Sequence, residues 1–337
     1  MPAMPAQNNR QFLLAKRPAG AATRDTFTYQ EVPVGKPGTN QILVRNQYLS
    51  LDPAMRGWMN EGKSYIPPVG LGEVMRALGV GEVIASNNPG FAVGDYVNGA
   101  LGVQDYFLGE PRGFYKVDPK LAPLPRYLSA LGMTGMTAYF ALLDVGAPKA
   151  GETVVISAAA GAVGSIAGQI AKLKGCHVVG IAGGGEKCRY LIEELGFDGV
   201  IDYKNEDVQA GLKRECPKGV DVYFDNVGGD ILDAVLTRLN LKARIVICGA
   251  ISQYNNKEAV KGPANYLALL VNRARMEGFV VLDYAPRFAA AGQEMAGWMA
   301  KGLLKSKEDI VEGLQTFPET LMKLFSGENF GKLVLKV

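Results

Sequence analysis

The chain of 337 residues carries 36 basic and 33 acidic side chains, a formal net charge of +3, and 48% of its residues are hydrophobic. A chain of this length exceeds the size at which one hydrophobic core usually stops growing, so two domains are expected. The composition is typical of a globular enzyme. The small net charge, without runs of like charge, argues against a nucleic-acid partner.

Two segments bear on targeting. Residues 1–10 are rich in Pro, Gln and Asn and lack the apolar core of a signal peptide, so we expect the protein to stay in the cytoplasm. Residues 153–171 carry no charge and approach the length of a membrane span. They begin with β-branched residues, continue through an Ala/Gly turn and end in small residues, which is typical of a strand, a turn and a helix. We therefore expect no membrane segment.

The first third of the chain has the pattern of a β domain. Between about Phe12 and Leu121, short β-branched runs alternate with Gly/Pro turns. The predicted strands are 41–48, 78–85, 96–101 and 114–116.

From about Ser129, apolar helical segments alternate with strand-like runs, beginning with a helix over 131–143. This alternation predicts a parallel sheet covered by helices, and six strands fit a doubly wound sheet of two halves. A helix beginning near Ser306 should follow, and the last run, 331–337, alternates like a strand that returns to the β domain. The predicted domain boundaries are therefore 1–128, 129–305 and 306–337. The six strands are expected at 153–157, 177–182, 199–202, 221–225, 244–248 and 278–282.

The clearest local motif is the run 154–164, VVISAAAGAVG, which passes from a strand through a Gly turn into a helix expected to open at Ser165. Its glycines let the backbone approach a pyrophosphate, and the helix N-terminus offers N–H donors to the anion. The run departs from G-x-G-x-x-G because Ala159 occupies the first glycine position. A turn that only packs a helix on a strand is the alternative, but the flanking strand, helix and second strand favour a dinucleotide site.

The end of the second strand indicates which dinucleotide binds. An NAD enzyme usually has an acid there, whereas the 2′-phosphate of NADP needs a cation. Here Ala182 and Gly183 are small and neutral, with Lys187 just beyond and Arg189 next. Glu186 conflicts, but in the first turn of a helix an acid is favourable for dipole reasons. The pattern favours NADPH, the alternative being that Lys187 is only a solvated helix charge.

Metal ligands are scarce. Cysteine and histidine first appear at Cys176, and none of the later residues has C-x-x-C spacing. Cys176 and His177 are adjacent, so on a strand their side chains would point to opposite faces. We predict no metal site and no disulfide. The complete set is Cys176, His177, Cys188, Cys216 and Cys248.

Several motifs together carry a family resemblance. They are 46–56 (NQYLSLDPAMR), 131–139 (LGMTGMTAY), 158–164, 224–229 (FDNVGG), 247–255 (ICGAISQYN) and 329–332 (NFGK). With these motifs the chain resembles, over nearly its whole length, the medium-chain dehydrogenase/reductase superfamily. Within it, the chain is most similar to the zinc-independent branch of leukotriene 12-hydroxydehydrogenases, prostaglandin reductases and alkenal double-bond reductases. The run 67–75 (PPVGLGEVM) resembles bacterial members that reduce curcumin-like dienones.

The resemblance implies a Rossmann nucleotide domain inserted in a GroES-like β domain that binds substrate, an active-site cleft between them, and usually a homodimer. Leu78 stands where plant relatives tend to carry a Tyr, so their substrate range is not transferred. The implied cofactor residues are Gly161, Ala162, Val163 and Gly164 for the pyrophosphate; Lys187 and Tyr203 for the 2′-phosphate; Asn226, Cys248, Gly249, Ala250, Ile251, Ser252 and Tyr254 for the adenosine and ribose; and Phe279, Val280, Val281 and Asn329 for the nicotinamide. Taken singly, Tyr203 could end a strand, Phe279 could be core and Asn329 could be a turn residue.

The chemistry needs a hydrogen-bond donor. Hydride transfer to the β-carbon of an enone leaves charge on the carbonyl oxygen, and the α-carbon then needs a proton. Zinc ligands are missing, and no tyrosine has a lysine four positions later, so the Tyr-Lys pair of short-chain reductases is absent. Tyr254 is the best candidate donor. The alternatives are that Tyr254 only lines the cleft and that the ribose 2′-hydroxyl of the cofactor supplies the proton. Tyr48 is a second candidate for substrate contact.

Three functions remain open from the sequence. The first is NADPH-dependent reduction of the C=C bond of a small enone, alkenal or curcumin-like dienone. The second is an NADPH quinone oxidoreductase on the same fold. The third is a non-catalytic NADPH-binding protein with a crystallin-like or sensing role.

Overall fold

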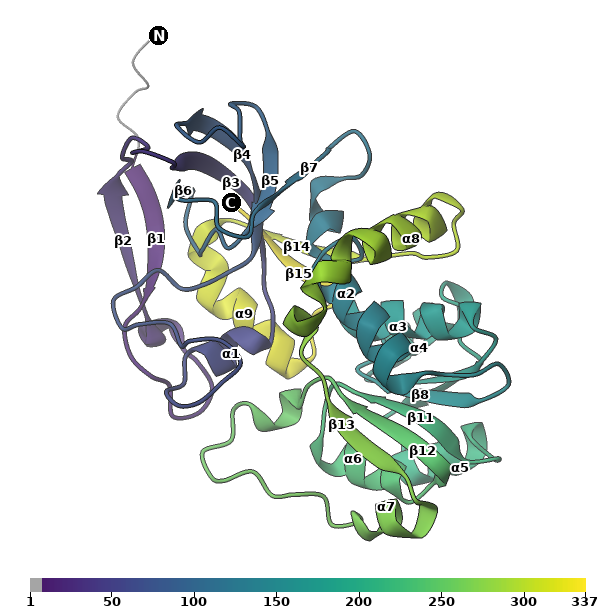
Figure 1. The fold of residues 1–337 in the computed structure, drawn as a ribbon. Helices are drawn as coiled ribbons and strands as arrows, with labels where there is room; N and C mark the ends of the chain where they lie inside the picture. The colour runs from purple at the N-terminus through teal and green to yellow at the C-terminus, as the bar shows by residue number, and fades with distance from the viewer. Residues whose placement is uncertain (1–7) are drawn as a thin grey trace. The chain divides into compact units, whose positions relative to one another are not determined.

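The computed structural model describes residues 8–337, so most of the segment considered for a signal peptide lies outside the described residues. The chain forms two compact units. The first contains the chain up to Leu128 together with Glu308–Val337, and the second is Ser129–Lys307. In Figure 1 the first unit is coloured purple to blue in its N-terminal part and yellow in its C-terminal part, and the second unit runs from teal to yellow-green.

The first unit is mainly β-structure. A two-stranded antiparallel ribbon accompanies a seven-stranded sheet in the order β14-β15-β3-β4-β5-β7, with β6 paired to β3. The C-terminal strand β15 runs antiparallel to β3, with Leu335 opposite Leu49, so the end of the chain pairs with this unit. The strands are β1 (Asn8–Leu14), β2 (Phe27–Pro33), β3 (Ile42–Ser50), β4 (Gly79–Ser86), β5 (Tyr96–Gly99), β6 (Tyr106–Gly109), β7 (Tyr115–Val117), β14 (Glu308–Glu312) and β15 (Lys332–Lys336).

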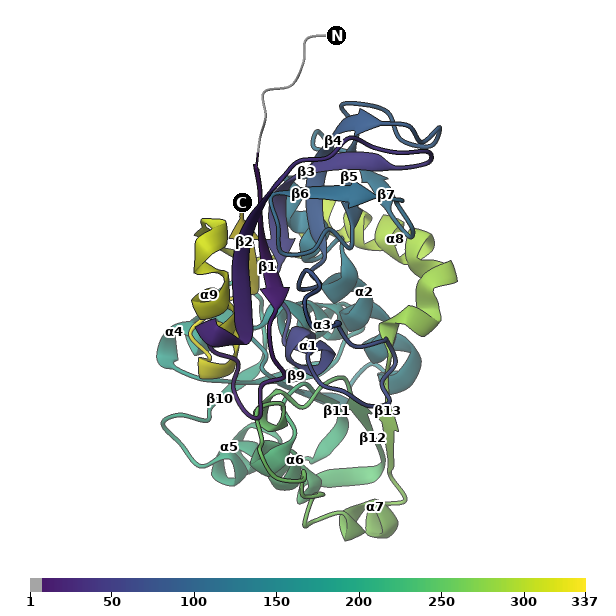
Figure 2. The ribbon, with the colours of Figure 1, turned by 90° about the vertical axis from the view of Figure 1, so that its left-hand side faces the viewer.

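The described residues of this unit form two α-helices, the short α1 (Ala54–Trp58) and α9 (Phe317–Ser326). Figure 2 shows α9 running beside the β1–β2 ribbon. The contact is aromatic, because the ring of Phe317 lies 5.4 Å from that of Phe12 and 4.9 Å from that of Phe27. All three side chains are buried, so α9 closes one side of the core of this unit.

The second unit is a doubly wound sheet of six parallel strands in the order β10-β9-β8-β11-β12-β13, as predicted. Strand β8 is buried throughout and β11 almost so, which explains their continuous apolar sequence. The strands are β8 (Thr153–Ser157), β9 (His177–Ala182), β10 (Gly199–Asp202), β11 (Val220–Asp225), β12 (Leu239–Ile247) and β13 (Arg275–Gly278).

Helices cover both faces of this sheet (Figure 1). Right-handed crossovers from β8 outward to β10 place α3 and α4 on one face, and crossovers in the opposite direction place α5 and α6 on the other. The strand order therefore reverses beside β8, where α/β proteins bind ligands. The helices are α2 (Met133–Phe140), α3 (Ala162–Leu173), α4 (Gly185–Glu193), α5 (Val208–Glu215), α6 (Gly229–Leu236), α7 (Leu267–Asn272) and α8 (Phe288–Ala300).

Some predicted boundaries are wrong. Helix α3 begins at Ala162 rather than Ser165. The sixth strand is Arg275–Gly278 rather than 278–282, because this edge strand is largely exposed and has no apolar run to reveal it. The helix expected near Ser306 is replaced by strand β14, and a helix begins only at Phe317. The hydroxyl of Ser306 is buried with no hydrogen-bond partner among residues 8–337, so it caps nothing there.

The uncharged segment 153–171 is β8, a turn and most of α3. Within the described residues, no helix combines the length and the apolar character needed to cross a membrane.

Candidate dinucleotide site

The predicted phosphate turn lies between β8 and α3, at the carboxyl edge of the parallel sheet. The turn is tight: the amide of Gly161 donates to the carbonyl of Ala158 at 2.9 Å, and Ala158 takes a φ of +47°. Gly161 is the N-cap of α3 and has no side chain to cap the helix. The N–H groups of Ala162, Val163 and Gly164 in the first turn therefore have no side-chain cap, which is the arrangement that binds phosphate.

Gly164 is required by packing rather than by its dihedral angles. A Cβ atom at Gly164 would lie 2.5 Å from the carbonyl oxygen of Ala158 and 2.9 Å from the Cα of Ala159. Both neighbours are backbone atoms that cannot rotate away. The residue therefore fixes how closely α3 approaches the turn.

The alanine at the first glycine position is compensated on the neighbouring strand. The amide of Ala159 donates to the carbonyl of Ile181 in β9 at 3.0 Å. Its methyl group occupies space next to Gly180, where a Cβ atom would lie only 2.9 Å from it. Because Gly180 has no side chain, β9 leaves room for the methyl group of Ala159. The turn therefore tolerates an alanine at the first position of G-x-G-x-x-G.

The region predicted to hold the 2′-phosphate is built from the ends of β9 and β10. The ring of Tyr203 lies directly over Gly183, because a Cβ atom at Gly183 would be 2.9 Å from the ring and its hydroxyl. Tyr203 follows β10 and is 42% exposed, so part of its ring faces solvent. The amide of Gly184 donates to Asp202 Oδ1 at 2.8 Å. Burial raises the pKa of Asp202, but hydrogen bonds from Gly184, Asn205 and Lys204 outweigh it and lower that pKa overall.

Two cations follow this turn on α4. Lys187 is half-buried, and Glu186 lies in the first turn as predicted. The second cation is Arg189, which is not among the predicted site residues. Its Nη1 atom lies 3.6 Å from the position of a Cβ atom at Gly185, one helical turn back. Side chains on a helix lean toward its N-terminus, which brings this guanidinium back to the turn.

Asn226 joins the end of β11 to the phosphate turn. Its side-chain amide donates to the carbonyl of Ser157 at 2.7 Å, and its backbone amide donates to Ser157 Oγ at 2.8 Å. Ser157 is the last residue of β8. These hydrogen bonds therefore join β8 and β11, the two strands on either side of the switch point, at their carboxyl ends.

The segment 248–252 is held against the turn that follows β11. The amide of Ile251 donates to Asn226 O at 3.1 Å, and Ser252 Oγ donates to the carbonyl of Val227 at 2.6 Å. Burial raises the pKa of Cys248 to about 12, so its thiol is neutral at physiological pH.

Tyr254 folds back over the same segment. Its hydroxyl accepts a hydrogen bond from the amide of Ala250 at 3.1 Å and lies 3.1 Å from the position of a Cβ atom at Gly249. The side chain is half-buried. The phenol oxygen is therefore the acceptor in this contact.

Residues 279–281 follow β13 at the same edge of the sheet. The amide of Phe279 donates to the carbonyl of Ile247 at 3.1 Å, and its ring lies 5.2 Å from that of Tyr284. Tyr284 in turn stacks on Phe140 at 4.9 Å. Phe279, Val280 and Val281 are half-buried rather than core residues, so they form an apolar wall backed by aromatic rings.

Two predicted site residues lie in the first unit. Tyr48 is in β3, opposite Val80 and Lys336, and packs on a small buried cluster that includes Val80 and Val334. Asn329 precedes β15, and its side-chain amide donates to Gly331 O at 3.1 Å.

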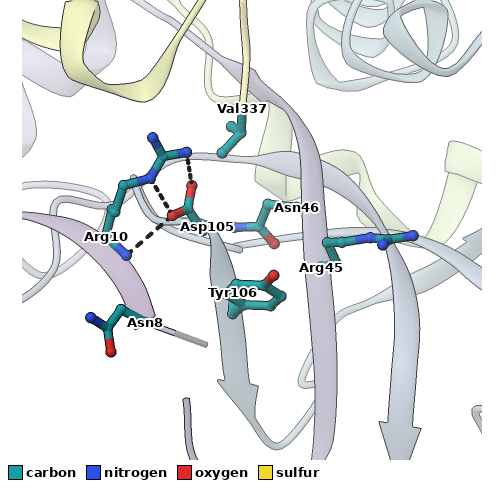
Figure 3. A pocket seen from close by; sticks show the side chains of 7 residues that line it. All are labelled: Asn8, Arg10, Arg45, Asn46, Asp105, Tyr106 and Val337. Atoms are coloured by element: carbon teal, nitrogen blue, oxygen red, sulfur yellow. Dashed lines mark hydrogen bonds and ion pairs between the residues drawn. The ribbon is translucent and has the colours of Figure 1, made fainter. Parts of the chain in front are cut away.

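The first unit also contains a cavity of about 260 Å³ (Figure 3). Arg10 and Asp105 form an ion pair in its wall, with contacts of 2.6 and 2.9 Å. Arg45 is likewise paired, with Glu82 at 2.6 Å. The cavity contains none of the residues predicted to bind cofactor, and its arginines are already neutralised. Its lining is Asn8, Arg10, Arg45, Asn46, Asp105, Tyr106 and Val337.

Among residues 8–337 there is no group of three His, Cys, Asp or Glu side chains placed to hold a metal ion. Cys176 is buried, whereas a ring nitrogen of the adjacent His177 lies 3.0 Å from the carbonyl of Glu215. All four cysteines are free thiols.

A doubly wound sheet with a phosphate turn at its switch point, inserted in a β unit, defines a dinucleotide-binding oxidoreductase. Family models described as "N-terminal domain of oxidoreductase" and "Zinc-binding dehydrogenase" match residues 10–117 and 162–297. The chain belongs to the medium-chain dehydrogenase/reductase superfamily, in its branch of zinc-independent double-bond reductases.

Individual relatives match almost the whole chain. The NADPH-dependent curcumin reductase of Escherichia coli is 45% identical, covering 98% of this chain and 97% of its own. The NADP-dependent 2-alkenal reductase of Nicotiana tabacum is 42% identical over 98% of both chains. The solved structure of CurA from Vibrio vulnificus in complex with NADPH has a TM-score of 0.92 and 43% identity, covering 97% of this chain and 99% of that one.

Proposed function

We propose that this protein is an NADPH-dependent reductase of the C=C double bond of α,β-unsaturated ketones and aldehydes. The observation that carries the proposal is the near-complete match to a curcumin reductase and a 2-alkenal reductase, joined to a close structural relative that holds NADPH. The substrate is a small molecule, which we expect the enzyme to meet in the cytoplasm.

The residues fit NADPH. The first turn of α3, at Gly161, Ala162, Val163 and Gly164, would bind the pyrophosphate. Lys187 and Tyr203, with Arg189, would hold the 2′-phosphate. Asn226, the segment 248–252 and Tyr254 would contact the adenosine and ribose, and Phe279, Val280, Val281 and Asn329 would hold the nicotinamide. When bound, the cofactor supplies the hydride.

The protein's own part in the reaction is to stabilise negative charge and move a proton. As hydride reaches the β-carbon, charge develops on the substrate carbonyl oxygen, where a preorganised donor is most effective. The Tyr254 hydroxyl, which accepts a hydrogen bond from the Ala250 N–H, is the candidate donor to that oxygen. Tyr48 is a second candidate for substrate contact.

The NADP preference makes a testable prediction. Replacing Lys187 with alanine should raise the KM for NADPH by roughly tenfold or more, because a charge-assisted hydrogen bond contributes about 1.5–3 kcal/mol. The KM for NADH should barely change, since NADH has no 2′-phosphate. Steady-state kinetics with both cofactors measure the difference, and an equal loss with each would refute the role of Lys187.

Three functions are separated by one experiment. NADPH oxidation is followed against a panel of enals, enones, dienones and quinones. The proposed reductase prefers the first three classes, whereas a quinone oxidoreductase turns over quinones and uses alkenals poorly. A non-catalytic NADPH-binding protein would bind the cofactor tightly but would not transfer its hydride to any acceptor in the panel, which would overturn the proposal.

We also propose that the protein is a homodimer formed through α7 and β13. An apolar patch surrounds α7, and β13 ends the six-stranded sheet, so one edge of its backbone has no strand partner in the described chain. If a two-fold axis passes near Met276, antiparallel β13 strands place Arg275 opposite Glu277 of the partner subunit, which is a complementary pair. The exposed patch residues are Tyr266, Leu267, Leu270 and Val271.

A charge placed in this patch should separate the subunits. Leu270 is 75% exposed, so Leu270→Glu removes no core contact. Two leucines withdrawn from an interface cost at least about 3 kcal/mol, or roughly a hundredfold in the dimer dissociation constant. Light scattering after size exclusion should give half the wild-type mass. Leu121→Glu, an equally exposed leucine in the first unit, is the matched control, and a dimer that survives Leu270→Glu would contradict the interface.

A further inference from the structure

Asp225, the last residue of β11, is fully buried next to the predicted cofactor contacts and accepts several hydrogen bonds. Its Oδ1 atom accepts hydrogen bonds from Ser157 Oγ at 3.0 Å and from the Tyr223 hydroxyl at 2.8 Å. The same atom accepts from the backbone amides of Val227 and Gly228, both at 2.9 Å. One carboxylate oxygen therefore accepts hydrogen bonds from two side chains and from two amides of the turn that follows β11.

The backbone of the same residue holds a second turn. The carbonyl oxygen of Asp225 accepts from the amides of Cys248 at 2.9 Å and Gly249 at 3.1 Å. The two turns also touch, because a Cβ atom at Gly228 would lie 3.1 Å from the Cβ of Ala250. Asp225 thus connects the end of β8, the segment 226–228 and the segment 248–250.

The other carboxylate oxygen is in a different situation. Oδ2 is buried and has no hydrogen-bond partner among the described residues. Burial raises the pKa of Asp225, although the hydrogen bonds to Oδ1 oppose this shift. A buried carboxyl group with one unsatisfied oxygen costs stability. Such a cost suggests that the residue is retained for what it organises.

We propose that Asp225 is a positioning residue for the cofactor, which sets NADPH affinity by fixing Asn226 and the segment 248–250 relative to the phosphate turn. The inference rests on the proposed function, because those segments are the ones assigned to NADPH. Asp225 is buried beneath them and acts only through its neighbours. Ser157 is the link to the phosphate turn, since its Oγ donates to Asp225 and accepts from the amide of Asn226 at 2.8 Å.

The test is direct NADPH binding, measured by cofactor fluorescence, together with turnover at saturating NADPH. In Asp225→Asn a neutral amide oxygen replaces the carboxylate as acceptor, and buried N–H groups replace the unpartnered oxygen. We expect the Kd for NADPH to rise about tenfold, with kcat at saturation within about twofold of wild type. Ser157→Ala removes the Oγ bridge between Asp225 and the backbone amide of Asn226 but keeps the contact of the Asn226 side chain with the carbonyl of residue 157. This variant should raise the Kd several-fold and serves if Asp225→Asn does not fold.

The matched control is Tyr223→Phe. Tyr223 is also fully buried and donates to the same oxygen, and its other side-chain hydrogen-bond partner is Ser157 in β8 rather than a residue of either turn. Its melting temperature should fall while the Kd for NADPH stays unchanged. A Kd that rises equally in Tyr223→Phe, or that stays unchanged in Asp225→Asn or Ser157→Ala, would overturn the inference alone. Failure of the wild-type protein to bind NADPH would overturn the proposed function as well.

Discussion

Replacing Gly164 with alanine is expected to raise the Kd for NADPH by about a hundredfold. The new methyl group would lie 2.5 Å from the carbonyl oxygen of Ala158, far inside van der Waals contact. Because that neighbour is backbone, the start of α3 must move away from the turn. The N–H groups that bind the pyrophosphate move with it, and losing two hydrogen bonds to a charged group, at about 1.5 kcal/mol each, weakens binding by about a hundredfold.

Fluorescence titration with NADPH measures this change, and circular dichroism establishes whether the variant is folded. Gly297→Ala is the matched control, because Gly297 lies in α8 of the same unit with no atom within 4 Å of its Cβ position. That variant should bind NADPH normally and be slightly more stable, since alanine favours helix. If Gly164→Ala is folded and binds NADPH like wild type, the turn after β8 is not the phosphate site.

The parallel sheet could be predicted because its central strands are buried on both faces and therefore appear in the sequence as apolar runs. The edge strands could not. Strand β13 is mostly exposed, and β14 has no fully buried residue, so neither has a pattern that differs from a loop. In both places the backbone pairing, rather than side-chain burial, defines the strand.

In the candidate site, the local motifs could be predicted and the contacts between strands could not. The glycines of the turn and Lys187 follow β8 and β9 directly in sequence. The packing of Ala159 on Gly180, of Tyr203 on Gly183, and the four donors on Asp225 all depend on how separate strands are aligned. Only β-strand register brings such residues together, and register is not encoded in a short motif.

Tyr254 is the remaining residue whose replacement should have a large effect. Its hydroxyl is held by the amide of Ala250, within a segment that is hydrogen-bonded to the turn after β11. A phenol fixed in this way loses little entropy when it donates to a developing oxyanion, which is the condition for an efficient transition-state contact. A tyrosine that only lined the pocket would gain nothing from that orientation.

Tyr254→Phe should therefore lower the rate of hydride transfer by about a hundredfold, since removing one donor from an oxyanion site costs roughly 3 kcal/mol. NADPH affinity should change little, because the interaction exists mainly in the transition state. The variant also leaves the amide of Ala250 without its acceptor, but that group is only half-buried and water can replace the phenol. Single-turnover reduction of an enone at saturating NADPH separates the chemical step from binding, with Tyr203→Phe as a control that should affect affinity alone. An unchanged rate would reduce Tyr254 to a wall of the pocket and leave the ribose 2′-hydroxyl of the cofactor, or water, as the proton source.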